Sequence, residues 1–184
     1  MKFQLELQFD CGLSWPKIEF ASDVSLSETL INEYKKSIIV SGELIDSLAF
    51  RNTNKSEKET ILDSQGKIAR DQVVSIKKIW VEDILLDLNL LAQYIIYKPV
   101  YHQGYINYCK VNNIDIKESL QVYDLYFNGS WKINFQQPFW PWYADIRRKN
   151  DASNMLKQDA ELYLGNSSGE YQDLIDKLVW LLNV

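Results

Sequence analysis

The sequence predicts a mainly β fold, an antiparallel β-sandwich or a jelly-roll-like pair of sheets with a few short helices and a C-terminal helix. Two observations lead to this prediction. Apolar and polar residues alternate from position 3 to position 10, and a second alternating stretch follows the dipeptide Asn128-Gly129. The chain has 184 residues, 46% of them hydrophobic, which suffices for one ordinary core. We therefore expect a single globular domain over 1–184.

The first ten residues contain the clearest strand. Cys11-Gly12 ends it, and Trp15-Pro16 favours an extended or turning backbone before a second short strand at 18–20. In the first strand, apolar residues at every second position are expected to face the core, and the polar residues between them to face water: Phe3, Leu5, Leu7 and Phe9 against Gln4, Glu6, Gln8 and Asp10.

A short helix is expected over Leu26–Lys35. Ser25 and Glu28 have the spacing of a capping box, in which a serine and a glutamate satisfy free amides at the start of a helix. Apolar side chains then recur at helical spacing. The β-branched residues within 37–44 predict the next strand, and the polar stretch 51–59 predicts an exposed, mobile loop.

Between Val73 and Leu86 the pattern is again that of a strand. Its phase shifts near Glu82-Asp83, which indicates either a bulge or two strands. The residues that follow fit a helix or a strand by their periodicity. We favour a strand, a turn near 87–89 and another strand to Tyr97, ended by Lys98-Pro99.

The last part of the chain predicts a helix, a hairpin and a second helix. Tyrosines at positions 101, 105 and 108 have helical spacing within 101–110. Asn128-Gly129, between the stretches 121–127 and 130–136, is typical of a two-residue type I′ turn. We expect the terminal helix to cover the chain's own sheet, with pairing to a partner chain as the alternative. It is predicted by a capping box, Ser167 and Glu170, and by an apolar stripe of Leu174, Ile175, Leu178, Leu181 and Leu182.

The charge and the apolar segments exclude several partners. A net charge of −5 and a pI near 5.0 argue against nucleic acid, because a binder needs a positive face to displace counterions from phosphates. The basic cluster 147–149 is interpreted as a solvated patch. No membrane association is expected, since the longest uncharged stretch, 88–97, is too short to span a bilayer. The first ten residues lack a continuous apolar segment, so we expect a cytoplasmic protein.

Catalytic and metal chemistry find little support in the sequence. His102 is the only histidine, and Cys109 lies two helical turns further, too far for a direct hydrogen bond. Cys11 and Cys109 lack the spacing of a disulfide framework or a zinc site, and no glycine-rich phosphate-binding motif is present. Asp71, Glu82, Asp83 and Asp87 lie near one another without EF-hand spacing. No cofactor is expected, although a calcium site built from loops stays open.

Aromatic clustering is the unusual feature of the sequence. Trp140, Trp142 and Tyr143 follow the expected hairpin, and the neighbouring Pro138 and Pro141 interrupt regular strand pairing. Because successive side chains of a strand face opposite sides, neighbouring rings here cannot all enter one core. We therefore expect some of them at the surface, with Tyr97 and Tyr101 as the next candidates. The alternative is that these rings complete the core.

The sequence thus predicts a non-catalytic binding module that uses a surface aromatic cluster to bind a carbohydrate or a protein. The main alternative is a cytosolic protein–protein interaction factor, such as an inhibitor, an immunity protein or an assembly protein, because an acidic surface suits a basic target. A carboxylate- or metal-dependent enzyme is the third alternative.

Overall fold

The computed structural model describes residues 1–43 and 46–164, of which 156–164 by the backbone alone. The chain divides into two compact units, Met1–Phe135 and Gln136–Val184, which are described separately below. The single domain over 1–184 stays a prediction. The terminal helix predicted from Ser167 onward lies outside the described residues.

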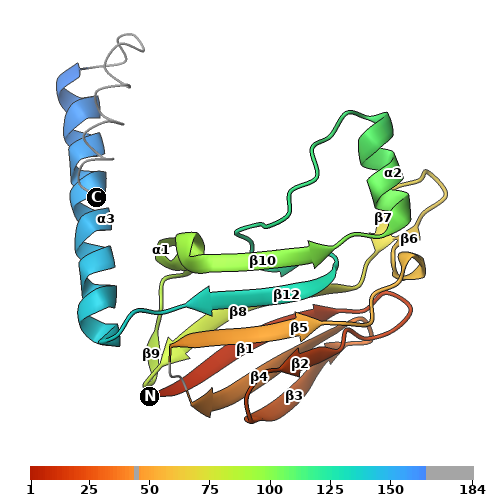
Figure 1. Ribbon diagram of the computed structural model, residues 1–184, viewed down its shortest axis with the longest axis horizontal. Coiled ribbons are helices and arrows are strands. Elements are labelled where there is room, and N and C mark those ends of the chain that lie inside the picture. Colours follow the sequence, from red (N-terminus) through yellow and green to blue (C-terminus); the bar gives the residue numbers. More distant parts are fainter. Residues whose placement is uncertain (44–45, 165–184) are drawn as a thin grey trace. The chain divides into compact units, whose positions relative to one another are not determined.

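The first unit consists mainly of antiparallel strands in two larger sheets, which confirms the predicted fold class (Figure 1). One sheet has the order β11-β8-β1-β4-β3, with β9 also paired to β8: β1 Lys2–Asp10, β3 Val24–Asn32, β4 Lys35–Glu43, β8 Val73–Val81, β9 Ile84–Leu85 and β11 Asp124–Leu125. The other sheet has the order β10-β12-β5-β2: β2 Ile18–Phe20, β5 Ser47–Asn52, β10 Ile95–Val100 and β12 Asn128–Asn134. A small third sheet pairs β6 (Ile61–Leu62) with β7 (Ile68–Arg70).

The core of this unit lies on the inner faces of the two larger sheets. The alternation predicted for β1 is confirmed, because all four of its apolar residues are buried. On the second sheet, Phe50 and Trp131 stack with their ring centroids 5.2 Å apart. Full burial of one such large apolar side chain contributes about 1.5–3 kcal/mol. The central strands of the two sheets contribute several nearly fully buried side chains: Leu5, Leu7, Val40, Ile79, Phe50, Trp131 and Ile133.

The helix predicted near residue 30 is wrong, because this segment forms β3 and the turn into β4. Apolar residues four apart, such as Leu26 and Leu30, share one face of a strand as well as one face of a helix. Pairing with β4 selected the strand. Glu28 forms an ion pair of 3.0 Å with a lysine of β4, and the Ser25 hydroxyl donates to a β4 carbonyl at 3.3 Å. Both residues of the expected capping box thus contact the neighbouring strand.

The hairpin predicted at Asn128-Gly129 is also wrong. These residues begin β12, and the strand before them, β11, pairs with β8 in the other sheet. The Asn128 side chain accepts from the Lys55 amide and donates to the Lys55 carbonyl, both at 2.7 Å. Gly129 has a φ of +152° and lies so close to β10 that a Cβ would be 2.3 Å from the Lys98 carbonyl oxygen. The dipeptide therefore permits a close contact between strands.

The phase shift near Glu82-Asp83 corresponds to a tight hairpin between β8 and β9. Both residues have positive φ, 48° and 64°, as a type I′ turn requires, and Val81 pairs with Ile84 across them. A register shift of β8 against β1 adds a bulge near Lys77. Of the two alternatives that the sequence left near Glu82-Asp83, the structure contains the two strands.

The segment after β9 is helical where we expected a turn and a strand. α1 (Leu88–Leu91) is capped by Asp87, which accepts from the Asn89 amide at 2.9 Å, and the 3₁₀ helix η2 (Ala92–Tyr94) continues it. β10 follows and runs through Pro99 instead of ending before it. Within the described sheet β10 is an edge strand, where a proline needs no ladder partner on its outer side.

The polar segment 51–59 was expected to be an exposed loop, and this prediction is wrong for its key residues. Asn52 belongs to β5 and is buried, and Lys55 is 5% exposed. The Lys55 ammonium lies 2.6 Å from Asp71 and 2.9 Å from the Gln72 carbonyl oxygen. A buried charge needs such partners, so the contacts of Lys55 hold the segment 51–59 against the residues that directly precede β8.

Glu59 forms a second set of such contacts, with the residues that follow β1. Its carboxylate accepts from the amides of Leu13 and Ser14 at 2.7 and 2.9 Å, and from the Ser14 hydroxyl at 2.9 Å. Burial raises the pKa of Glu59, but these hydrogen bonds outweigh burial and hold the pKa below its ordinary value of 4.5. The ionised carboxylate therefore stabilises this loop.

Gly129→Ala should lower the free energy of unfolding by more than about 2 kcal/mol, because the new methyl group would overlap the β10 backbone. Urea unfolding measures this loss. Gly66→Ala is the matched control: Gly66 has a φ of +76° but nothing within 4 Å of an added Cβ, so only the backbone strain of about 1 kcal/mol is expected. Equal losses in the two variants would contradict a close contact at Gly129.

Acid should destabilise the wild-type protein more steeply than Glu59→Gln. A carboxylate whose pKa is lowered by folding stabilises the folded state above its ordinary pKa, and this contribution disappears as the pH falls through the folded pKa. Urea titrations from about pH 6 to about pH 3 measure the effect. Glu43→Gln, at an exposed carboxylate, is the control and should follow the wild type. If the free energy of unfolding falls with pH as steeply in Glu59→Gln as in the wild type, Glu59 is not the group responsible for the acid sensitivity.

Candidate functional site

The aromatic segment that begins at Phe139 forms the first turns of α3 (Phe139–Leu164), in the second unit. The strand geometry used to predict its exposure is therefore wrong. Pro141 is accepted there, because first-turn amides have no partner within a helix. Trp140 and Trp142 are half-buried, and Tyr143 is buried. Phe139 contacts all three rings, with centroid distances of 4.9, 5.7 and 6.0 Å.

Tyr97 and Tyr101 lie in the first unit, so the five predicted site residues are divided between the two units. Tyr97 is 1% exposed, and its hydroxyl donates to the Phe127 carbonyl at 2.6 Å. Burial raises the pKa of Tyr97, which fits a core residue. Tyr101 is half-buried, and its hydroxyl donates to the Lys117 carbonyl at 2.8 Å.

Tyr101 is the first member of a row of three rings that we call the tyrosine stack: Tyr101, Tyr105 and Tyr108. The helix predicted from these tyrosines is confirmed as α2 (Gln103–Val111). Successive rings are stacked, with centroids 5.3 and 6.5 Å apart and planes at 20° and 28°. Phe127 contacts the first two rings from the side, at 4.9 and 4.8 Å.

The outer part of the stack belongs to an exposed apolar area. Tyr105 is 37% exposed, Tyr108 is 57% exposed and Val111 is 83% exposed. These residues are three apart on the helix, so each neighbours the next, and we call them the α2 surface. Further exposed apolar residues lie on both sides of α2 in the chain: Val100, Ile114 and Ile116.

α2 makes few contacts with the rest of the first unit. Cys109 is its one buried residue, in a helix that is described throughout. At its start, the Gly104 amide donates to a Glu57 carboxylate oxygen at 2.9 Å, which links α2 to the 3₁₀ helix η1 (Glu57–Glu59). Figure 1 shows α2 following the end of β10. Within the part of the chain that the structure describes, most residues of α2 are exposed.

The stacked arrangement decides what the α2 surface can bind. Tyr105 stacks on a ring at each side, so it offers no open ring face for stacking on a sugar. The exposed ring edges of Tyr105 and Tyr108 and the Tyr108 hydroxyl remain available. A hydrogen bond with the Cys109 thiol raises the pKa of Tyr105, and burial raises it further. The Tyr105 hydroxyl is therefore already paired within the chain.

The other candidate groups are placed apart or paired internally. His102 directly precedes α2, and among the described residues its buried Nε2 has no hydrogen-bond partner. Its ring centroid lies 6.2 Å from that of Phe127. In the basic cluster on α3, Arg148 and Lys149 pair with Asp145 at 2.7 and 3.6 Å. Throughout the described ranges, no three His, Cys, Asp or Glu side chains gather closely enough to hold a metal ion.

Comparison with known proteins gave no relatives: a scan against family models, a search of curated proteins and a search of solved structures each found no match. Function therefore has to be argued from the geometry of this chain. None of the helices in the described part of the chain is both long enough and apolar enough to cross a membrane.

Two residues of the α2 surface, Tyr105 and Tyr108, served in the sequence to predict a helix and were counted among the clustered aromatic residues, but they were not chosen as site residues. Their spacing could also have indicated a row of rings, because positions three and four apart on a helix are neighbours. Tyr97, in contrast, was grouped with them by its residue type. Its place in an alternating strand, opposite Trp131, put its ring in the core instead.

Tyr97→Phe should destabilise the protein by about 1 kcal/mol, because it removes a buried hydrogen bond to the Phe127 carbonyl. Tyr108→Phe is the matched change at an exposed ring and should stay within about 0.5 kcal/mol of the wild type. Urea unfolding of both variants distinguishes a core tyrosine from a surface one. A loss at Tyr108 as large as that at Tyr97 would contradict the exposure of the α2 surface.

Proposed function

We propose that this protein is a non-catalytic binding module whose ligand is another protein, held at the α2 surface. The observation that carries the proposal is the stacked, exposed row of Tyr105 and Tyr108, extended by Val111. A contiguous exposed apolar area of this kind is typical of protein-interaction sites. The cytosolic interaction factor considered from composition belongs to the same class.

Tyrosine suits this role for physical reasons. It offers a large contact area with few rotatable bonds, so little conformational entropy is lost when a partner binds. Stacking restrains the rings further before the partner arrives, because each ring limits the rotation of the next. The Tyr108 hydroxyl can supply a directional hydrogen bond at the edge of the apolar contact.

A carbohydrate is the second candidate ligand, at the start of α3. Trp140 meets Phe139 edge-on, with the ring planes at 87°, and both Trp140 and Trp142 are half-exposed. Trp140 also meets Tyr143 edge-on, with the ring planes at 75°. A partly exposed indole offers a flat apolar surface, which is what stacking on a sugar ring needs. The two proposals differ in which substitution should weaken binding. This is Tyr108→Ser for a protein at the α2 surface, and Trp140→Ala with Trp142→Ala for a carbohydrate at α3.

The experiment places a photo-crosslinking amino acid at position 108 of the full chain, in cells of the source organism. We expect one protein partner to be crosslinked from position 108, and not from the exposed position 77 on β8. With that partner purified, Tyr108→Ser should weaken binding about tenfold and Val111→Asp by more, since interface tyrosines contribute about 1–2 kcal/mol each.

Trp140→Ala with Trp142→Ala is the matched control, and it should leave protein binding unchanged while folding remains cooperative. Binding on a glycan array that is lost in this double variant and kept in Tyr108→Ser would support the carbohydrate at α3 and contradict the protein ligand. Equal crosslinking from positions 77 and 108 would contradict a specific α2 surface.

A further inference from the structure

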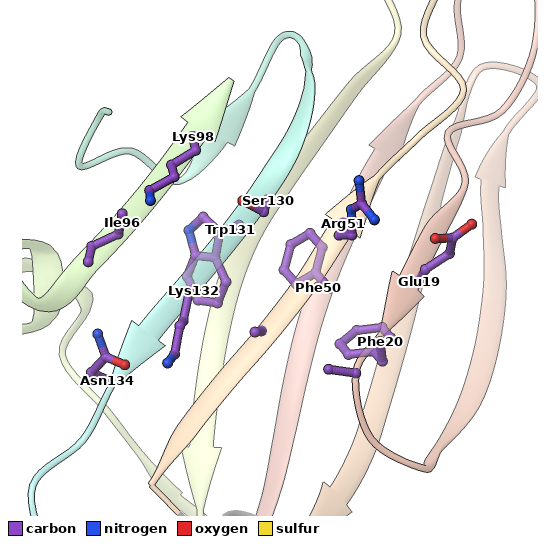
Figure 2. A pocket seen from close by; sticks show the side chains of 12 residues that line it. Glu19, Phe20, Phe50, Arg51, Ile96, Lys98, Ser130, Trp131, Lys132 and Asn134 are labelled. Carbon is purple, nitrogen blue, oxygen red and sulfur yellow. The ribbon is translucent and has the colours of Figure 1, made fainter. Parts of the chain in front are cut away.

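The outer face of the second sheet carries a hollow of about 400 Å³ (Figure 2). The strand register places its residues in rows. In one row Lys98 of β10, Ser130 of β12 and Arg51 of β5 lie side by side, and Glu19 of β2 follows. In the next row Lys132 of β12 lies between its neighbours on β10 and β5. Figure 2 shows these side chains arising from neighbouring strands.

This hollow, called the groove below, is deep at its centre because the residues there have small side chains. Ala49 stands opposite Lys132, and Ala21 lies beside it on the chain that follows β2. Ser130 is the centre of the adjacent row. The apolar side chains of Ile96, which is 40% exposed, and of Phe20 lie at the margin. Small residues flanked by long ones on one sheet face produce a groove.

Three cationic residues, Lys98, Lys132 and Arg51, line this groove, on a chain whose net charge is −5. The Cα atoms of Lys98 and Arg51 are separated by two strand spacings, about 10 Å, so their long side chains can converge above Ser130. Within the described ranges, none of Lys98, Lys132 and Arg51 forms an ion pair, whereas lysines on the other sheet do. Three positive charges and the one carboxylate of Glu19 leave a local charge of +2, by 3 − 1.

We propose that this groove binds a small organic phosphate monoester with an apolar group. The phosphate carries a charge of about −1.5 to −2 at neutral pH, which matches the local charge. Its three oxygens can accept from the Arg51 fork, from the two lysines and from the Ser130 hydroxyl. The apolar group lies along Ala49 toward Ile96. A volume of about 400 Å³ is in the range of small-molecule sites.

The groove is distinct from the α2 surface in its chemistry and in its residues, so the proposal does not depend on the proposed function. An acidic protein segment is the competing occupant. It would be recognised by the same cations, but it would not require the small floor, because carboxylates can meet long cationic side chains above a filled groove.

The test titrates the full chain with phenyl phosphate, inorganic phosphate and benzyl alcohol, followed by amide chemical shifts in NMR spectra. Phenyl phosphate should bind most tightly and shift the amides of Ala49, Ser130 and Lys132. Lys132→Gln and Arg51→Gln should each weaken phenyl phosphate about tenfold, as expected for the loss of a charge-assisted hydrogen bond. Lys77→Gln, at an exposed lysine of β8, is the matched control and should bind as the wild type does.

Ala49→Leu fills the floor and keeps every charge, so it should abolish phenyl phosphate binding while urea unfolding remains cooperative. Benzyl alcohol binding as tightly as phenyl phosphate would overturn the proposal, because charge would then be irrelevant. Equal weakening by Lys77→Gln and Lys132→Gln would also overturn it. So would binding of a poly-glutamate peptide that Lys132→Gln weakens and Ala49→Leu leaves intact, which would identify the acidic segment instead.

Discussion

The close approach of β10 to β12 at Gly129 sets the arrangement of the first unit around both proposed sites. A side chain at position 129 would occupy the space of the Lys98 carbonyl oxygen, so the two strands can pair in this register only with glycine there. Because side chains alternate along a strand, the register sends Tyr97 into the core and Lys98 to the opposite face. The end of β10 then determines where α2 begins.

Polar residues hold the loops that surround this core. Asn128 binds both backbone groups of Lys55, Lys55 pairs with Asp71, and Glu59 accepts the amides after β1. Each of these groups is buried or partly buried, and each has a specific partner, so the loops are fixed by directional interactions. Glu57, in the neighbouring 3₁₀ helix, connects the same region to α2.

Two surfaces of the first unit follow from this construction, and they differ in chemistry. The α2 surface is apolar and is made of rings that restrain one another, which suits a protein partner. The groove between Lys98 and Arg51 is cationic with a small floor, although the chain as a whole is acidic. Net charge therefore describes long-range attraction, whereas the local arrangement of strands decides which ligand charge a site prefers.

By itself the sequence determined the elements whose pattern depends on local burial: the alternating β1, the β-branched β4, the tyrosine-spaced α2 and the mainly antiparallel β class. It did not determine β3, because the spacing of Leu26 and Leu30 fits a helix as well as a strand. It did not determine the role of Asn128-Gly129, because Asn and Gly suit a turn as well as a close contact between strands. It likewise grouped the aromatic residues by type. Pairing between strands decided these cases, with the neighbouring β4 for β3 and with the more distant β5 and β10 for β12, since a register shift of one residue exchanges the buried face and the exposed face. For the same reason, the meeting of Arg51, Lys98 and Lys132 on one face was decided by tertiary structure alone.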